Sequence, residues 1–450
     1  MLTIGRIRLR LAAIVVLGCA SAFPLCTVAQ DQPQGPVTIS LTEAIHRAQQ
    51  NEPLFATVAG MQKSAAIDSY IAKAALLPSA VYHNQMIYTQ PNGKTDTGPQ
   101  GSPQELPIFI ANNGVHEYVS QASITETIGL KQVEDARLAS ANAARASAEL
   151  EIARRGLVAA VVGLYYAVSD AESKQQLLAN SLKEAQSFTS VTEKREAARE
   201  IAHADVVKAE LQQQQKQRDL NDAIVVAERA RLELGVLLFP DPRTPYKTIP
   251  PDTASPLPAR DEVDRLASAN NPEIRSALAD LRAGNAGVAS ARAAYLPDLG
   301  LNFSYGIDAP QVAKRGPDDV LNLGYSITGT LDIPVWDWFS TQKRVKQSEI
   351  RRDIAKVNLT AAQRRIIAAL GENYAEASMA RNQLTLLDQS VKTAAESLRL
   401  IKLRYSAGES TALEVVDAQN AYLAAETAQA DGIVRYQVAL ADLQILTGTL

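Results

Sequence analysis

The sequence predicts a mainly α-helical fold with β-strands, in which long coiled-coil-like helices occur in two tandem copies and four amphipathic strands interrupt them. Three observations lead to this prediction. Short landmarks recur at a fixed offset, long stretches lack proline, and two segments alternate between apolar and polar side chains. The composition agrees, because 46% of the 450 residues are hydrophobic but only 5% are aromatic, which favours helices with small-residue contacts.

The N-terminus has the features of a secretory signal peptide. Arg6, Arg8 and Arg10 precede an apolar run at 11–18, which is shorter than the roughly 20 residues of a membrane-spanning helix. We expect cleavage after Ala29, which would remove residues 1–29. The alternative is a lipoprotein signal in which Cys19 is acylated. The only other cysteine lies at position 26, so cleavage after residue 29 would leave no cysteine for a disulfide or a metal site.

The remaining chain is predicted to be a tandem duplication. Asn-Glu-Pro at 51–53 recurs as Asn-Asn-Pro at 270–272, and Leu-Leu-Pro at 76–78 recurs as Tyr-Leu-Pro at 295–297, both with an offset of 219 residues. Later, Ala-Asp-Val-Val at 204–207 recurs as Leu-Glu-Val-Val at 413–416, with an offset of 209. These landmarks predict three parts after the signal peptide. They are a first repeat at 30–239, a proline-rich surface linker at 240–260 and a second repeat at 261–450.

Each repeat has the same predicted order of elements. A helix of about 35 residues comes first, at 41–77 and at 261–296, and a proline stops it. A β-hairpin follows at 79–128 and at 298–334, and long helices occupy the rest of each repeat. Stretches such as 210–223 are polar almost all round, so these helices are expected to be stable only when they pack side by side.

The strands of the second repeat carry the clearest pattern. At 298–308 and 320–332, apolar side chains occupy alternate positions, and small or polar side chains lie between them. The apolar positions are Leu299, Leu301, Phe303, Tyr305 and Ile307, followed by Leu321, Leu323, Tyr325, Ile327 and Leu331. A tilted strand needs about ten residues to cross a bilayer, which is the length of these segments. A soluble sheet with one buried face would show the same alternation.

Two further features favour a membrane. The loops at 89–116 and 308–318 are long and polar, and the only two tryptophans, Trp336 and Trp338, follow the second hairpin as expected of anchors at a membrane interface. Four strands cannot close a pore, and lipid does not tolerate open sheet edges. The chain is therefore expected to combine its strands with those of other copies.

The sequence resembles the TolC-like outer membrane efflux proteins over residues 40–450. The resemblance is carried by RYSAGESTALEVVDAQNAYLAAE at 404–426, by the paired N-x-P segments and by IPVWDWF at 333–339. It implies a homotrimer that forms one shared twelve-stranded β-barrel in the lipid of the bacterial outer membrane, over an α-helical tunnel in the periplasm. It also implies a passive, gated conduit of a tripartite efflux or secretion system. The implied partners are a periplasmic adaptor protein and an inner-membrane pump of the resistance-nodulation-division or ATP-binding cassette type.

The resemblance also implies a gate at the periplasmic tip, where the helix breaks after Arg404-Tyr405. Glu414 and Asp417 match family carboxylates that line a constriction, and Tyr405 and Asp205 match residues that restrain it. Gly408 suits the break, because glycine adopts positive φ without a Cβ clash. A solvated helix face is the alternative interpretation of the two carboxylates.

The chain departs from the family pattern at three positions of the tip. Ser410 stands where at least some members have a basic residue, so the restraining bonds are expected to differ. The first repeat has Glu196 and Arg199 where the second repeat has tyrosine and glycine.

No sequence pattern indicates a catalytic, metal or nucleotide site. The four histidines, at 46, 83, 116 and 203, are isolated, so we predict no cofactor and no enzymatic activity. The formal net charge of −4 argues against nucleic acid as a partner. The alternative function is a trimeric structural or adhesive coiled-coil protein of the outer membrane or periplasm without transport. Such a protein would carry contiguous strands at its C-terminus, whereas a periplasmic adaptor would have a single helical hairpin.

Overall fold

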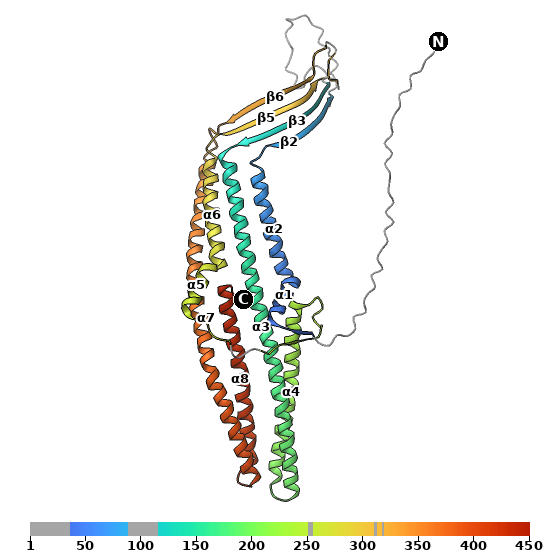
Figure 1. Cartoon of the computed structure of the whole chain (residues 1–450), viewed down its shortest axis with the longest axis vertical. Coiled ribbons are helices and arrows are strands. Elements are labelled where there is room, and N and C mark those ends of the chain that lie inside the picture. The colour runs from blue at the N-terminus through green and yellow to red at the C-terminus, as the bar shows by residue number, and fades with distance from the viewer. Residues whose placement is uncertain (1–36, 89–115, 251–254, 310–312, 317–318) are drawn as a thin grey trace, which may run out of the picture.

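The computed structural model describes residues 37–88, 116–250, 255–309, 313–316 and 319–450. A four-stranded sheet occupies one end of the elongated chain, and long helices extend from it to the opposite end (Figure 1). This arrangement confirms the predicted class, a mainly helical chain with some strands. The predicted signal peptide, Cys19 and most of the polar loop at 89–116 lie outside the described residues.

Eight helices are present in the described part of the chain. They are α1 (Leu41–Asn51), α2 (Pro53–Ala74), α3 (Leu130–Ala197), α4 (His203–Leu238), α5 (Arg260–Asn270), α6 (Pro272–Ala293), α7 (Ser340–Ser406) and α8 (Ala412–Thr447). Their lengths match in pairs: α1 and α5 have 11 residues, α2 and α6 have 22, and α4 and α8 have 36. The longest, α3 with 68 residues, spans about 100 Å at 1.5 Å per residue.

The prediction of one continuous helix at 41–77 and another at 261–296 is wrong. Each is divided in two, at Glu52 and at Asn271, which both adopt an extended conformation. The cause is the proline that follows each residue, because proline disfavours the α conformation of the residue before it and suits the first position of a new helix. The Glu52 carboxylate accepts a hydrogen bond from Phe55 N (2.6 Å), and Asn271 Oδ1 accepts one from Glu273 N (2.9 Å).

The segment at 240–260 is not purely a surface linker. It contains β4 (Tyr246–Thr248), which pairs in parallel with β1 (Val37–Ile39). The Tyr246 ring is buried and packs against Phe239, with 5.6 Å between ring centroids. The local proline signal correctly excluded a helix, but it carried no information on this distant strand pairing.

The largest hydrophobic core lies midway along the helices. Val158, Val161 and Val162 of α3 pack there with Leu234 and other side chains of α4, and with the β1–β4 pair. One window of 18 residues in α3 is long and apolar enough to cross a membrane by composition, and 39% of it is buried within the chain. Part of the apolar character of α3 is therefore explained by this core.

Tyr165 joins the two strands to this core and is a sensitive point for stability. Its hydroxyl donates to Ile39 O (2.9 Å) or Ile249 O (3.2 Å), and accepts a hydrogen bond from Ile249 N (2.9 Å). We expect Tyr165→Phe to lower the free energy of unfolding by about 1–3 kcal/mol, because partly buried backbone groups would lose their partner. Chemical denaturation measures this change. Tyr166→Phe is the matched control, because the Tyr166 hydroxyl forms no hydrogen bond to a described residue. An equal loss of unfolding free energy in both variants would contradict the role given to the Tyr165 hydroxyl.

The four remaining strands form one antiparallel sheet. They are β2 (Ser79–Tyr88), β3 (His116–Ile128), β5 (Asp298–Ala309) and β6 (Leu323–Asp332), in the order β2-β3-β5-β6. The pairing of β3 with β5 therefore joins the two predicted hairpins. As a consequence, β2 and β6 are left as open edges in a single chain.

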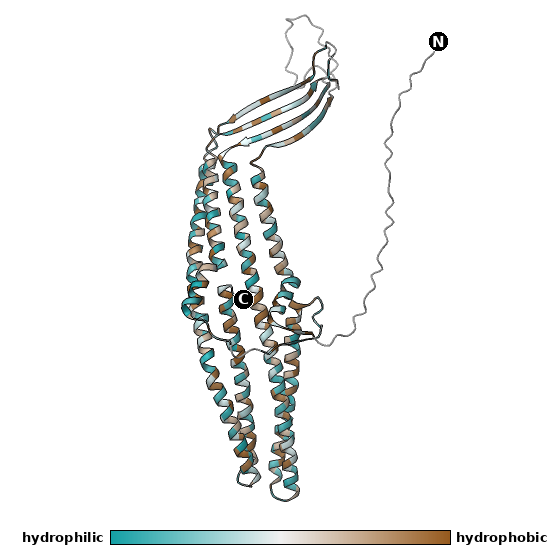
Figure 2. Cartoon of the chain, in the orientation of Figure 1, coloured by the Kyte–Doolittle hydropathy of each residue, from teal (hydrophilic) through white to brown (hydrophobic). Residues whose placement is uncertain are grey.

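The two faces of the sheet differ sharply in chemistry. Cross-strand register aligns Ile124, Phe303 and Ile327 in one row, and this face is exposed: Ile327 has 72% of its surface accessible. The opposite face carries polar rows, in which Ser123 Oγ lies 3.1 Å from Ser304 Oγ. The alternation along the strands is visible as alternating hydropathy (Figure 2). A soluble sheet would bury such an apolar face, and none of the described helices covers it.

Candidate gating site at the helical tip

Two helical turns lie together at the end of the chain that is remote from the sheet (Figure 1). One joins α3 to α4, and the other joins α7 to α8. They have the same hydrogen-bond pattern: Arg199 N donates to Glu196 O (2.7 Å) in the first turn, and Gly408 N donates to Tyr405 O (3.0 Å) in the second. The same backbone geometry is therefore built from different side chains.

The residue that reverses the chain in each turn adopts the left-handed conformation. Gly408 has φ of +81°, as the sequence predicts, and Arg199 has φ of +65°. A left-handed conformation costs about 1–2 kcal/mol for a residue with a Cβ atom, but not for glycine. The first turn therefore carries strain that the second turn lacks.

This difference gives a matched pair of substitutions. We expect Arg199→Gly to raise the free energy of unfolding by about 1 kcal/mol, and Gly408→Ala to lower it by a similar amount. A Cβ atom at position 408 would meet no atom within 4 Å, so the second effect would come from backbone conformation alone. Thermal or chemical unfolding measures both changes, and effects of the same sign would contradict this account.

Glu414 and Asp417 lie on the exposed side of the start of α8. The helix is capped by Thr411, whose Oγ1 accepts a hydrogen bond from Glu414 N (3.3 Å). The Glu414 carboxylate contacts the Ser410 hydroxyl, at the position where a basic residue is absent. No ion pair to a described residue neutralises either carboxylate, so both present negative charge to the surroundings.

Tyr405 lies at the end of α7 and is only 6% exposed. Its ring packs on Phe188 of α3, with centroids 5.2 Å apart, in an apolar cluster with Ala412 and Val415. Burial raises the pKa of the Tyr405 hydroxyl above its ordinary value, and Arg195 opposes this rise while Asp205 adds to it. The hydroxyl is therefore protonated at neutral pH.

Asp205 and Tyr405 are not joined by a hydrogen bond in this structure. Asp205 lies half-buried in the first turn of α4, and the Tyr405 hydroxyl has no hydrogen-bond partner among the described residues. The two side chains are close enough to interact electrostatically. A restraint by these two residues therefore stays a prediction, and it does not rest on a direct hydrogen bond between them.

Arg195 makes the main polar contact between the two turns. Its Nη1 donates to the Tyr405 carbonyl (2.6 Å), its guanidinium lies 4.9 Å from the centroid of the Tyr405 ring, and its Nε pairs with Glu200 (3.0 Å). The carbonyl is among the last of α7, where a cation also interacts favourably with the helix dipole. Arg195 thus attaches the end of α7 to the end of α3.

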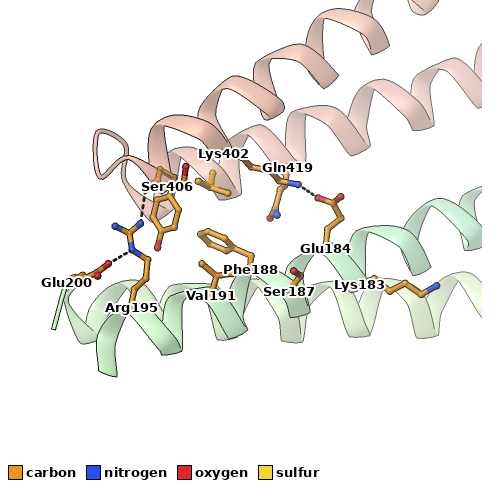
Figure 3. Close-up of a pocket in the computed structure, with 12 residues that line it drawn as sticks. Lys183, Glu184, Ser187, Phe188, Val191, Arg195, Glu200, Lys402, Ser406 and Gln419 are labelled. Atoms are coloured by element: carbon orange, nitrogen blue, oxygen red, sulfur yellow. Dashed lines mark hydrogen bonds and ion pairs between the residues drawn. The ribbon is translucent and has the colours of Figure 1, made fainter. Parts of the chain in front are cut away.

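A groove with a volume of about 610 Å³ separates the two helical hairpins beside this contact (Figure 3). Phe188 and Val191 form part of its apolar wall. Further from the turns, Lys402 of α7 pairs with Glu184 of α3 across the groove. The contacts of Arg195 and Lys402, a hydrogen bond from Gln212 Nε2 to Asn420 Oδ1 (2.8 Å) and the apolar cluster therefore hold the hairpins together near their tips.

The structure places the sequence-predicted tip residues near one another but assigns them different environments. Tyr405, Gly408, Glu414 and Asp417 belong to one turn, and Asp205 faces this turn from α4. Sequence reasoning missed Arg195, although a signal was present: Arg195 and Arg404 are separated by the same 209 residues as the later repeat landmarks. Pairs of Lys and Glu on different helices, such as Lys402 and Glu184, left no such signal.

The described residues contain no group of three or more His, Cys, Asp or Glu side chains that can hold a metal ion. His203, near the tip, contacts Glu196 with 2.8 Å between Nδ1 and Oε1. Trp336 and Trp338 lie far from the tip, between β6 and α7, and are both exposed.

Known proteins are similar to this chain in sequence and in fold. Residues 265–449 match the family model "Outer membrane efflux protein". The chain is 27% identical over 318 residues to the outer membrane protein OprJ of Pseudomonas aeruginosa, an alignment that covers 68% of this chain and 63% of OprJ. It is 25% identical over 406 residues to the pyoverdine export outer membrane protein OpmQ of Pseudomonas putida, covering 87% of this chain and 82% of OpmQ.

Solved structures agree with the fold over most of the chain. The Campylobacter jejuni CmeC outer membrane channel superimposes with a TM-score of 0.75 at 18% identity, covering 91% of this chain and 85% of CmeC. The open state of the Neisseria gonorrhoeae MtrE outer membrane channel gives a TM-score of 0.72 at 20% identity, covering 91% and 88%. Residues 265–449 thus match the outer membrane efflux protein family in sequence, and most of the chain shares its architecture of sheet and long helices with solved outer membrane channels.

Proposed function

We propose that this protein is the outer-membrane channel of a tripartite efflux or secretion system, a passive conduit that is gated at its periplasmic tip. The exposed apolar face of the sheet is the observation that carries this proposal. Tyr325 is 73% exposed on that face, and its neighbours across the sheet are also apolar. An apolar sheet face of this kind is stable when it contacts lipid while the polar face contacts water.

The open edges of the chain support assembly into a ring. β2 and β6 are the unpaired edges of the sheet, and α2 and α4 lie at the opposite side of the chain from α7 (Figure 1). These outer helices expose apolar side chains: Leu54, Met61, Ile67 and Tyr70 on α2, Leu211, Val225, Val226 and Val236 on α4, and Ile354, Val357, Ile367 and Leu386 on α7. Contact between different edges of successive copies closes into a ring when the rotation fits.

Three copies, as the family resemblance implies, would pool four strands each into one twelve-stranded barrel. Their helices would continue below it as a periplasmic tunnel of about 100 Å. The two repeats at 30–239 and 261–450, joined at 240–260, would then alternate around the ring. A signal peptide at 1–29 would direct export, with acylation of Cys19 as the alternative to cleavage after Ala29.

A periplasmic adaptor and an inner-membrane pump are the proposed partners. Proteins similar in sequence include the proteases secretion protein PrtF of Dickeya chrysanthemi and the toluene efflux pump outer membrane protein TtgI of Pseudomonas putida. Such different cargoes fit a conduit whose selectivity resides in the pump.

At the tip, three copies of Glu414 and Asp417 would form two acidic rings, which Tyr405, Gly408 and Asp205 help to position.

Conductance in a planar bilayer tests the proposal. We expect the purified protein to be a trimer in detergent and to show small, cation-selective conductance in the bilayer, because a closed tip lined by carboxylates favours cations. A folded trimer that conducts neither as wild type nor with its tip contact removed by Arg195→Ala would contradict the channel. The structural or adhesive alternative would then be preferred.

A further inference from the structure

The connection between β6 and α7 displays a cluster of aromatic rings. Trp336 stacks edge-on against Trp338 and Phe339, with ring centroids 5.8 and 5.1 Å apart. Despite these contacts, Trp336 is 63% exposed and Trp338 is 83% exposed. No other part of the described chain covers the cluster, and the corresponding connection between β3 and α3 has no aromatic residue.

The backbone of this connection is held in an unfavourable conformation. Trp338 and Phe339 both adopt positive φ, of 58° and 64°. Two successive bulky residues in the left-handed region are strained, and strain of this kind gathers at functional sites. The Asp337 carboxylate stabilises the turn, because its Oδ2 accepts a hydrogen bond from Thr341 N (2.6 Å). The strained residues Trp338 and Phe339 therefore carry rings that are exposed at the surface rather than packed in a core.

Three basic residues follow the rings in the sequence, and nearby carboxylates offset them only in part. The first two turns of α7 carry Lys343, Arg344 and Lys346, whereas Asp337 is the only carboxylate between residues 333 and 348. Lys343 and Arg344 are exposed and form no ion pair with a described residue, although Arg344 interacts electrostatically with Asp337. Lys346 makes a long contact with Glu349 (3.8 Å).

We propose that this surface, formed by Trp336, Trp338, Phe339, Lys343 and Arg344, binds anionic phospholipids of the membrane leaflet that faces the periplasm. Aromatic rings favour the boundary between acyl chains and headgroups, and lysine or arginine beside them attracts a phosphodiester of net negative charge. The inference rests on the proposed function, because that function places the helical end of the sheet at the membrane surface. It adds a lipid preference to the general role of the tryptophans as anchors.

The two tryptophans make the surface directly observable, since the chain contains no others. Full-length protein is reconstituted into equimolar phosphatidylcholine and phosphatidylglycerol, with brominated acyl chains on one lipid or on the other. Bromine quenches nearby tryptophan fluorescence, so random mixing gives equal quenching in the two preparations. We expect stronger quenching by brominated phosphatidylglycerol, with an enrichment of about fivefold for each cation at low salt.

Lys343→Gln/Arg344→Gln is expected to abolish the preference while quenching by brominated phosphatidylcholine remains, which shows that the protein is still correctly inserted. Lys194→Gln/Arg218→Gln removes the same charge near the opposite end of the helices and is expected to keep the preference. Equal quenching of the wild type by both lipids would overturn the inference and leave the channel intact.

Absence of quenching by either lipid in a conducting channel would also overturn it, because the rings would then be covered by a second copy of the chain. Absence of both quenching and conductance would reject the proposed function as well.

Discussion

Arg195→Ala is expected to raise the open probability of the reconstituted channel about tenfold or more. The substitution removes the charge-assisted hydrogen bond from Arg195 Nη1 to the Tyr405 carbonyl (2.6 Å) and the contact with the Tyr405 ring. A hydrogen bond to a charged group contributes about 1.5–3 kcal/mol, which corresponds to at least a tenfold change in an equilibrium. Single-channel recording measures the open probability directly.

Arg404→Ala is the matched control for this experiment. Arg404 occupies the corresponding place at the end of α7, but its guanidinium donates to Glu409 O (3.1 Å) within its own turn and does not connect the hairpins. We expect no change in open probability for this variant. Arg195→Lys should give an intermediate effect, because lysine keeps the charge but lacks the planar donor group. Equal opening in the Arg195→Ala and Arg404→Ala variants would refute a specific restraint by Arg195.

The second large effect is expected from the acidic residues of α8. Glu414→Ala/Asp417→Ala should reduce the preference of the channel for cations over anions by about fivefold or more, because each lost charge removes roughly 1 kcal/mol of attraction at close range. In a trimer the double substitution removes six carboxylates from the constriction, so the effect on selectivity is larger than for one copy. The reversal potential in a salt gradient measures the preference, and high salt should diminish the difference between wild type and variant.

A charge-matched control separates the constriction from the overall charge of the protein. Asp261→Asn/Glu262→Gln removes two exposed carboxylates from α5, which lies midway along the chain and away from the turns at the helical tip (Figure 1). Channels of this variant are expected to keep the cation preference of the wild type, because the carboxylates at the constriction remain. If Glu414 and Asp417 are dispensable for selectivity in channels that conduct normally, they form only a solvated helix face.

Local patterns in the sequence determined the elements of this protein. The alternation at 298–308 predicts β5 because side chains of a strand point to opposite faces with a period of two. The left-handed turn at Gly408 also follows from a local rule, since glycine tolerates positive φ. The division of the short helices at Glu52 and Asn271 follows from the proline after each of them, so the sequence contains this signal as well.

Only the tertiary structure decided how distant elements meet. The pairing of β3 with β5, the burial of Tyr246 beside β1 and the bond from Arg195 to Tyr405 each join segments that are remote in sequence. Residues on different helices have no fixed spacing, so the repeat offset marks Arg195 but does not show which group its guanidinium contacts. The exposure of the apolar sheet face was likewise decided by packing, because alternation defines two faces but not which one is covered.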